Sequence, residues 1–267
     1  MATEGLILNL MAVTTLIPAA FIGKRSEPGR DLVFWLLLAV AFVGPLLWVV
    51  TAFSAAWRTD LAAALWVTVT ATLGLFAAAA VLDRDAWRLA PVLWPLTLIL
   101  GIFAVIWSGH GASRPIGGEG AGWVSLHIVV SVATYALVTI AAVAALAAII
   151  QERALKAKRP TNLTRALPSI ADCDGLMIRF LAMGEAVLAI GLISGMALNF
   201  SATGAVLALD HKIILALAAF AMIAVLLFTH YRSGLRGRKA ARWALAAYLF
   251  LTLGYPGVKF VTDIILG

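Results

Sequence analysis

The sequence is poor in charge and almost free of cysteine. Only 12% of its 267 residues are charged, whereas 63% are hydrophobic. A soluble domain of this length needs far more charge to cover its surface, so the composition excludes an ordinary soluble globular protein. The single cysteine, Cys173, excludes an internal disulfide, a CxxC redox pair and a cysteine-rich metal site.

Motifs of the common hydrolytic and nucleotide-binding enzymes are also missing. The Gly-rich stretch 108–122 lacks the GxxxxGK spacing of a phosphate-binding loop and follows no strand pattern. The chain has no HExxH, no GxSxG and no cluster of acidic residues, so hydrolysis has no support. The net charge of +7 lies in connections between apolar runs, and we therefore expect no nucleic-acid partner.

Apolar runs near 20 residues long recur along the whole chain. Lipid offers no hydrogen bonds to an exposed backbone, so such runs are predicted to be membrane-spanning helices. We predict an all-α polytopic membrane helix bundle in one transmembrane domain, 1–267. Its eight spans are expected at about 5–23, 32–53, 61–82, 89–108, 123–150, 180–200, 210–230 and 243–265. The one long connection, 151–179, is expected to lie along the membrane surface.

Basic residues alternate between the two sides of this predicted topology. The first, third, fifth and seventh connections hold most of the 20 Lys and Arg residues. The other side holds only Arg58, Arg114, Lys212 and Lys259. Because positive charge is retained in the cytoplasm, both termini are predicted on the outer, periplasmic side of a bacterial-type inner membrane. Glu4 precedes the first apolar run and Lys24 follows it, so we expect a retained first helix and no cleaved signal peptide.

Two of the four histidines enter the predicted membrane from the outer side at similar depth. His127 lies about one turn inside the fifth span, and His211 begins the seventh. His230 ends the seventh span at the cytoplasmic face, and His110 falls in an outer loop. Imidazole is the commonest neutral ligand of metals and of haem iron, so the matched pair could hold a bis-histidine haem. Each is also compatible with a helix-end histidine bonded to backbone or lipid headgroups.

Further polar residues accompany this pair. Ser131 and Tyr135 follow His127 at i+4 and i+8, which suits either a cavity or ordinary hydrogen bonds between helices. In the last span, Lys259 could pair with Asp263, extend to the interface, or meet a carboxylate such as a haem propionate. Glu185, within the sixth span, is the carboxylate that a proton or substrate path would use.

The stretch WVSLHIVVSVATYALVTIAAVAALAAIIQERALK, 123–156, resembles the core of the cytochrome c assembly protein family, the CcsA type. Three later stretches resemble its shorter HemX/YpjD-like branch in the same order. They are LPSIADCDGLMIRFLAMG (167–184), DHKIILALAAF (210–220) and HYRSGLRGRKAARWALAAYLFLTLGYPGVKF (230–260). The resemblance covers about 120–265 and implies an eight-span bundle with an outer haem-handling surface. It places His127 in an SLH motif and His211 in an HK motif.

The Trp-rich segment of the larger family members is absent, since only Trp107 and Trp123 flank the corresponding loop. The resemblance therefore implies a haem-binding chaperone or accessory factor in c-type cytochrome biogenesis, not a self-sufficient enzyme. Haem would be the cofactor. The residues implied as its ligands or neighbours are His127, His211, Ser131, Tyr135, Arg114 and Lys259. The expected partners are the lipid bilayer and other cytochrome c assembly or respiratory membrane proteins.

Two other functions fit the same sequence. A small-solute transporter predicts a water-accessible cavity that reaches Glu185. A structural or scaffolding subunit of a larger membrane complex predicts polar residues that are all satisfied internally.

Overall fold

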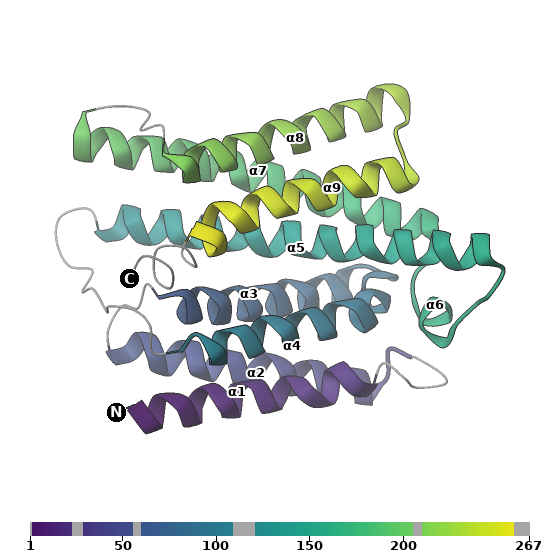
Figure 1. Ribbon diagram of the computed structural model, residues 1–267, viewed down its shortest axis with the longest axis horizontal. Coiled ribbons are helices and arrows are strands. Elements are labelled where there is room, and N and C mark those ends of the chain that lie inside the picture. The colour runs from purple at the N-terminus through teal and green to yellow at the C-terminus, as the bar shows by residue number, and fades with distance from the viewer. Residues whose placement is uncertain (1, 23–28, 56–59, 109–120, 205–209, 259–267) are drawn as a thin grey trace.

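A computed structural model describes residues 2–22, 29–55, 60–108, 121–204 and 210–258. Within these ranges the chain forms helices and no strand, which confirms the predicted all-α membrane fold. The long helices run back and forth between two ends of a bundle (Figure 1). They are α1 (Ala2–Ile22), α2 (Leu32–Ala55), α3 (Leu61–Leu82), α4 (Ala90–Ile106), α5 (Ala121–Ala157), α7 (Ile170–Thr203), α8 (His211–Ser233) and α9 (Gly237–Thr252). The short elements are η1 (Ala86–Leu89), α6 (Asn162–Ala166) and the π-helical turn η2 (Leu253–Gly257).

Six helical segments are long and apolar enough to cross a membrane: α2, α3, α4 together with the preceding turn η1, α5, α7 and α8. The apolar part of α1 is shorter, Gly5–Phe21, and α9 begins with a basic turn. Large apolar side chains such as Phe21, Ile193 and Phe228 are more than 60% exposed on the bundle surface. Such side chains need an apolar solvent, so the chain is a multi-pass membrane protein in contact with the bilayer. The exact number of spans and their orientation remain predictions.

The helices flanking the predicted long connection extend into it. The α5 helix continues to Ala157 and α7 already begins at Ile170, so 151–179 contains only a short linker around α6. The apolar runs do not extend to these helix ends, which carry polar residues. Specific hydrogen bonds stabilise the helices there instead. The Gln151 amide donates to the carbonyl oxygens of Thr164 and Pro168, each at 2.8 Å, and Ser169 caps α7.

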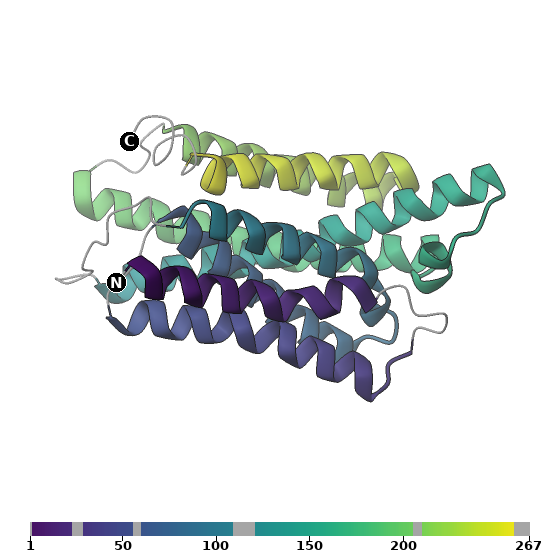
Figure 2. The same cartoon turned by 60° about the horizontal axis from the view of Figure 1, so that its bottom comes forward.

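The central helix of the bundle is α5. Its most apolar stretch is 83% buried inside the protein, against 17–56% for the other candidate spans. Figure 1 shows α5 between the group α1–α4 and the group α7–α9, and Figure 2 shows α1 and α2 on the side opposite α8 and α9. This position explains why α5 is rich in alanine, because small side chains let neighbouring helices approach it closely.

Glycines of α7 set its register against α5. A Cβ added at Gly184 would lie 2.9 Å from Cγ2 of Val138, and one at Gly191 would lie 3.4 Å from Cγ1 of Val130. A Cβ at Gly195 would lie 3.0 Å from Cε1 of His127. As the numbers rise along α7 they fall along α5, so the two helices pack antiparallel through a seam of small residues.

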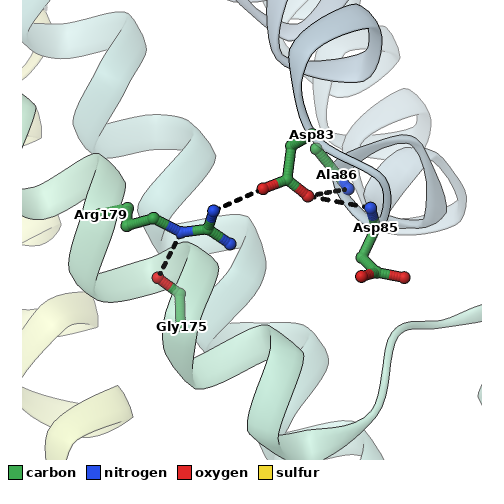
Figure 3. Close-up of polar contacts among 5 residues, drawn as sticks. All are labelled: Asp83, Asp85, Ala86, Gly175 and Arg179. Carbon is green, nitrogen blue, oxygen red and sulfur yellow. Dashed lines mark hydrogen bonds and ion pairs between the residues drawn. The ribbon is translucent and has the colours of Figure 1, made fainter.

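The two ends of the bundle differ in charge. We call the end where α5 finishes and α7 begins the basic end, because it carries Arg88, Arg153, Arg165, Arg179 and Arg238. We call the opposite end, where α5 and α8 begin, the histidine end. At the basic end Arg179 Nη1 lies 2.6 Å from Asp83 Oδ2, as Figure 3 shows. The other Asp83 oxygen accepts from the backbone N–H groups of Asp85 and Ala86, so this carboxylate links α7 to the turn after α3.

Candidate functional site at the histidine end

His127 lies on α5, about two turns from its start, and contacts α7. Its Nδ1 atom is 2.9 Å from the hydroxyl oxygen of Ser194, which is nine-tenths buried. The same hydroxyl donates to the carbonyl oxygen of Gly191, 3.0 Å away within α7. His127 itself is half-buried. The ring is thus held on one side by a buried polar group and is not enclosed by the protein.

Gly195 provides the surface against which this ring packs. A Cβ at position 195 would lie 3.0 Å from Cε1 and 3.7 Å from each ring nitrogen of His127. These similar distances mean that the imidazole lies across the helix backbone where a side chain would otherwise stand. Ser194 and Gly195 together form what we call the His127 seat.

His211 has a different environment at the same end of the bundle. It is the first residue of α8, its side chain is 63% exposed, and its Nδ1 lies 2.5 Å from Asp210 Oδ1. Figure 1 shows that α5 and α8 both begin at this end. The structure therefore gives His127 a partner on α7 and His211 a partner next to it in the chain.

The two residues predicted beside His127 use their hydroxyls elsewhere. Ser131 donates to the carbonyl oxygen of His127 itself at 2.7 Å, and its side chain is exposed. Tyr135 is buried and turns toward α9, where its hydroxyl lies 2.9 Å from Thr252 Oγ1 and 3.4 Å from the Tyr248 hydroxyl. Tyr135 therefore ties the central helix to α9 rather than supporting the histidine ring.

Several residues named from the sequence lie outside the described residues, among them Arg114, Lys259, Asp263 and His110. His230 lies at the basic end, where its Nδ1 is 2.9 Å from the carbonyl oxygen of Leu235 and closes the turn between α8 and α9. Across the described ranges, no three His, Cys, Asp or Glu side chains gather to hold a metal ion. A bis-histidine haem needs only two imidazole ligands from the protein, so it does not require such a group of three.

Exposed apolar side chains lie close in sequence to His127 and Ser194. Trp123, Leu126 and Val129 of α5 are 47–65% exposed, and Ile193 of α7 is 68% exposed. A porphyrin is a large, flat, apolar ligand with one metal at its centre. An imidazole beside exposed apolar side chains fits the chemistry of haem, which takes a nitrogen ligand and apolar contacts.

Glu185 lies nearer the middle of α7. Both of its carboxyl oxygens are buried, and neither has a hydrogen-bond partner among the described residues. A carboxylate in apolar surroundings without a partner is costly, so this residue is expected to be protonated or to serve a function.

Ser194 and Gly195 were not singled out from the sequence. The available signal was the recurrence of small residues on one face of the sixth span, at Gly184, Gly191, Ser194 and Gly195. That pattern predicts close helix packing. It does not identify the opposing residue, because the register with α5 only follows from the fold.

Comparison with known proteins finds a family model that matches this chain. The family model described as Cytochrome C assembly protein matches residues 31–266. A relative from Azospirillum brasilense, described as an uncharacterized 28.8 kDa protein in nifR3-like 5'region, is 47% identical over 99% of this chain and all of its own length.

Two more distant relatives carry names. Protein HemX of Brevibacillus brevis is 24% identical over 49% of this chain and 48% of its own length. Inner membrane protein YpjD of Escherichia coli (strain K12) is 25% identical over 67% of this chain and 66% of its own length. Both matches agree with the branch that the sequence resembles.

Proposed function

Because this chain belongs to the cytochrome c assembly protein family, we propose that it is a haem-binding chaperone or accessory factor in c-type cytochrome biogenesis. It would act in the inner membrane beside other cytochrome c assembly or respiratory membrane proteins. The observation that carries this proposal is the half-buried imidazole of His127, held through Nδ1 at the His127 seat near the start of the central helix.

His127 is the first candidate ligand of the haem iron and His211 the second. Bound haem would supply an iron that takes nitrogen ligands and a porphyrin that needs apolar contacts. The residues of this chain hold one imidazole in place, offer exposed apolar side chains around it, and keep His211 at the same end of the bundle. Arg114 and Lys259 are the candidate partners of the propionates.

The test is the visible absorption spectrum of the detergent-purified protein, oxidised and reduced, after reconstitution with haem. We expect low-spin Soret and α bands in the wild type that are lost or converted to high spin in His127→Ala and in His211→Ala. His230→Ala is the matched control, since this histidine lies at the basic end and bonds to the carbonyl oxygen of Leu235. A wild-type protein that takes up no haem would overturn the proposal, and an unchanged His211→Ala spectrum would remove His211 from the site.

Transport of a small solute is the second candidate, and the unpartnered carboxyl of Glu185 favours it. The single native cysteine makes a direct test simple. Glu185→Cys in a Cys173→Ala background should react with a membrane-impermeant thiol reagent if water reaches this depth. We expect no reaction, because the carboxyl oxygens of Glu185 are buried. Rapid labelling of Glu185→Cys would favour the transporter.

A further inference from the structure

The hydrogen bonds around Ser194 favour one of the two neutral tautomers of His127. A serine hydroxyl has one hydrogen to donate and two lone pairs to accept with. The Ser194 hydroxyl donates its hydrogen to the carbonyl oxygen of Gly191, 3.0 Å away in its own helix. With that hydrogen directed at Gly191, a lone pair of Ser194 Oγ faces His127 Nδ1, 2.9 Å away, and suits an N–H donor there. In neutral imidazole this places the proton on Nδ1 and leaves Nε2 with its lone pair.

We infer that Ser194 is a positioning residue that fixes His127 in its Nδ1–H form and so presents Nε2 as the iron-binding atom. This inference rests on the proposed haem-binding function. Histidines that bind metals commonly donate their second N–H to a neighbouring acceptor, which fixes the tautomer and the ring orientation. Ser194 is that acceptor here, and it is itself oriented by the bond to Gly191.

The geometry of the seat supports this role over a purely structural one. Ser194 is nine-tenths buried on the face of α7 that packs against α5, so its hydroxyl faces α5 instead of lipid. Gly195 removes the side chain that would push the ring away, since a Cβ there would approach Cε1 to 3.0 Å. The hydrogen bond to Ser194 and the close contact of Cε1 with Gly195 thus restrict the position of the ring. Neither contact uses Nε2 as a hydrogen-bonding atom.

The experiment measures the His127 tautomer in haem-free protein. The chain has only four histidines, so protein labelled with ¹⁵N-histidine gives few signals, and His127→Ala identifies those of His127. We expect the proton on Nδ1 in the wild type and in Ser194→Thr, which keeps the hydroxyl. Ser194→Ala should lose this preference and show a mixture of both tautomers. Ser201→Ala is the matched control, because Ser201 makes the same kind of bond, to the carbonyl oxygen of Leu198, on an exposed part of α7.

The second measurement is haem affinity. Loss of a residue that orients a metal-binding histidine typically weakens binding by about 10- to 100-fold. We expect a loss of this size in Ser194→Ala and recovery in Ser194→Thr. A wild-type His127 protonated on Nε2, or an unchanged tautomer in Ser194→Ala, would refute the inference whatever haem does. A correct tautomer shift in a protein that never binds haem would instead refute the proposed function alone.

Discussion

In one half of the helix pair α5 and α7 most side chains of α5 are buried, and we call it the dense half. In the other half they are partly exposed, and we call it the open half. From Thr134 to Ile149 every side chain of α5 is buried except Leu146, whereas from Gly122 to Ala133 none is. The same contrast follows α7, where Cys173, Asp174 and residues 176–178 are buried and the described side chains beyond Gly195 are not. Both halves contain α7 glycines that contact α5.

This difference indicates that one helix pair serves two purposes. In the dense half, a small residue permits close backbone approach, and dispersion contacts stabilise the fold. In the open half, a small residue makes room for the imidazole of His127. A glycine-to-alanine substitution should therefore mainly lower the stability in the dense half and mainly displace the histidine ring in the open half.

The largest effect is expected in the dense half, for Gly184→Ala. The new Cβ would lie 2.9 Å from Cγ2 of Val138, a fully buried side chain with little rotational freedom. Overpacking of this kind should lower the free energy of unfolding by about 2 kcal/mol. Thermal unfolding in detergent measures it. The control is Gly175→Ala in the same helix, where a Cβ meets nothing within 4 Å, so its stability should be unchanged or higher.

A somewhat smaller effect is expected at the basic end, for Asp83→Ala. This change removes the ion pair with Arg179 and an acceptor for two backbone N–H groups, at a cost of about 1.5 kcal/mol. Asp83→Asn keeps an acceptor oxygen and removes only the charge, so it should cost less. Arg179 is 61% exposed, and Arg179→Ala should cost at most about 1 kcal/mol. Equal losses in all three variants would show that the ion pair dominates instead of the backbone contacts.

The contrast between the halves could be predicted only in part. Apolar run lengths located the long helices, and α3 coincides with the predicted span 61–82 because charged or polar residues flank it closely. The helix α9 begins at Gly237, ahead of the predicted span 243–265, and the end of that span lies outside the described residues. The limits of α5 and α7 were missed because their polar ends are maintained by specific bonds, such as that of Gln151 to Pro168. Hydropathy carries no information about such bonds.

The site was predictable as a position and not as a set of contacts. The sequence placed His127 near the start of a span, but its partner Ser194 lies 67 residues away, and their approach depends on the helix register. Tyr135 was grouped with His127 by its i+8 spacing. At 3.6 residues per turn this spacing leaves the two residues roughly 80° apart around the helix. That angle is enough to turn Tyr135 toward α9.

At the boundary between the halves, Tyr135→Phe tests whether the dense region begins there. The change removes a buried hydroxyl that contacts Thr252 Oγ1 and should cost about 1 kcal/mol. Thr252→Val removes the other member of the pair. In a double-mutant cycle the two losses should not add, because both variants break the same contact. Strict additivity would mean that the hydroxyls do not interact in the folded protein.

The smallest effect on stability is expected in the open half, for Gly195→Ala. No described side chain from Gly195 to Thr203 is buried, so the backbone can adjust, and the helical preference of alanine offsets the strain. Thermal unfolding should then change by under about 0.5 kcal/mol. The new Cβ nevertheless occupies the position against which His127 packs and should displace the ring from Ser194. We therefore expect a near-native melting curve together with a changed ¹⁵N spectrum of His127, the reverse of Gly184→Ala. If Gly195→Ala instead lowered the stability as much as Gly184→Ala, while the folded protein kept the native His127 signals, both glycines would have the same packing role. The distinction between the two halves would then fail.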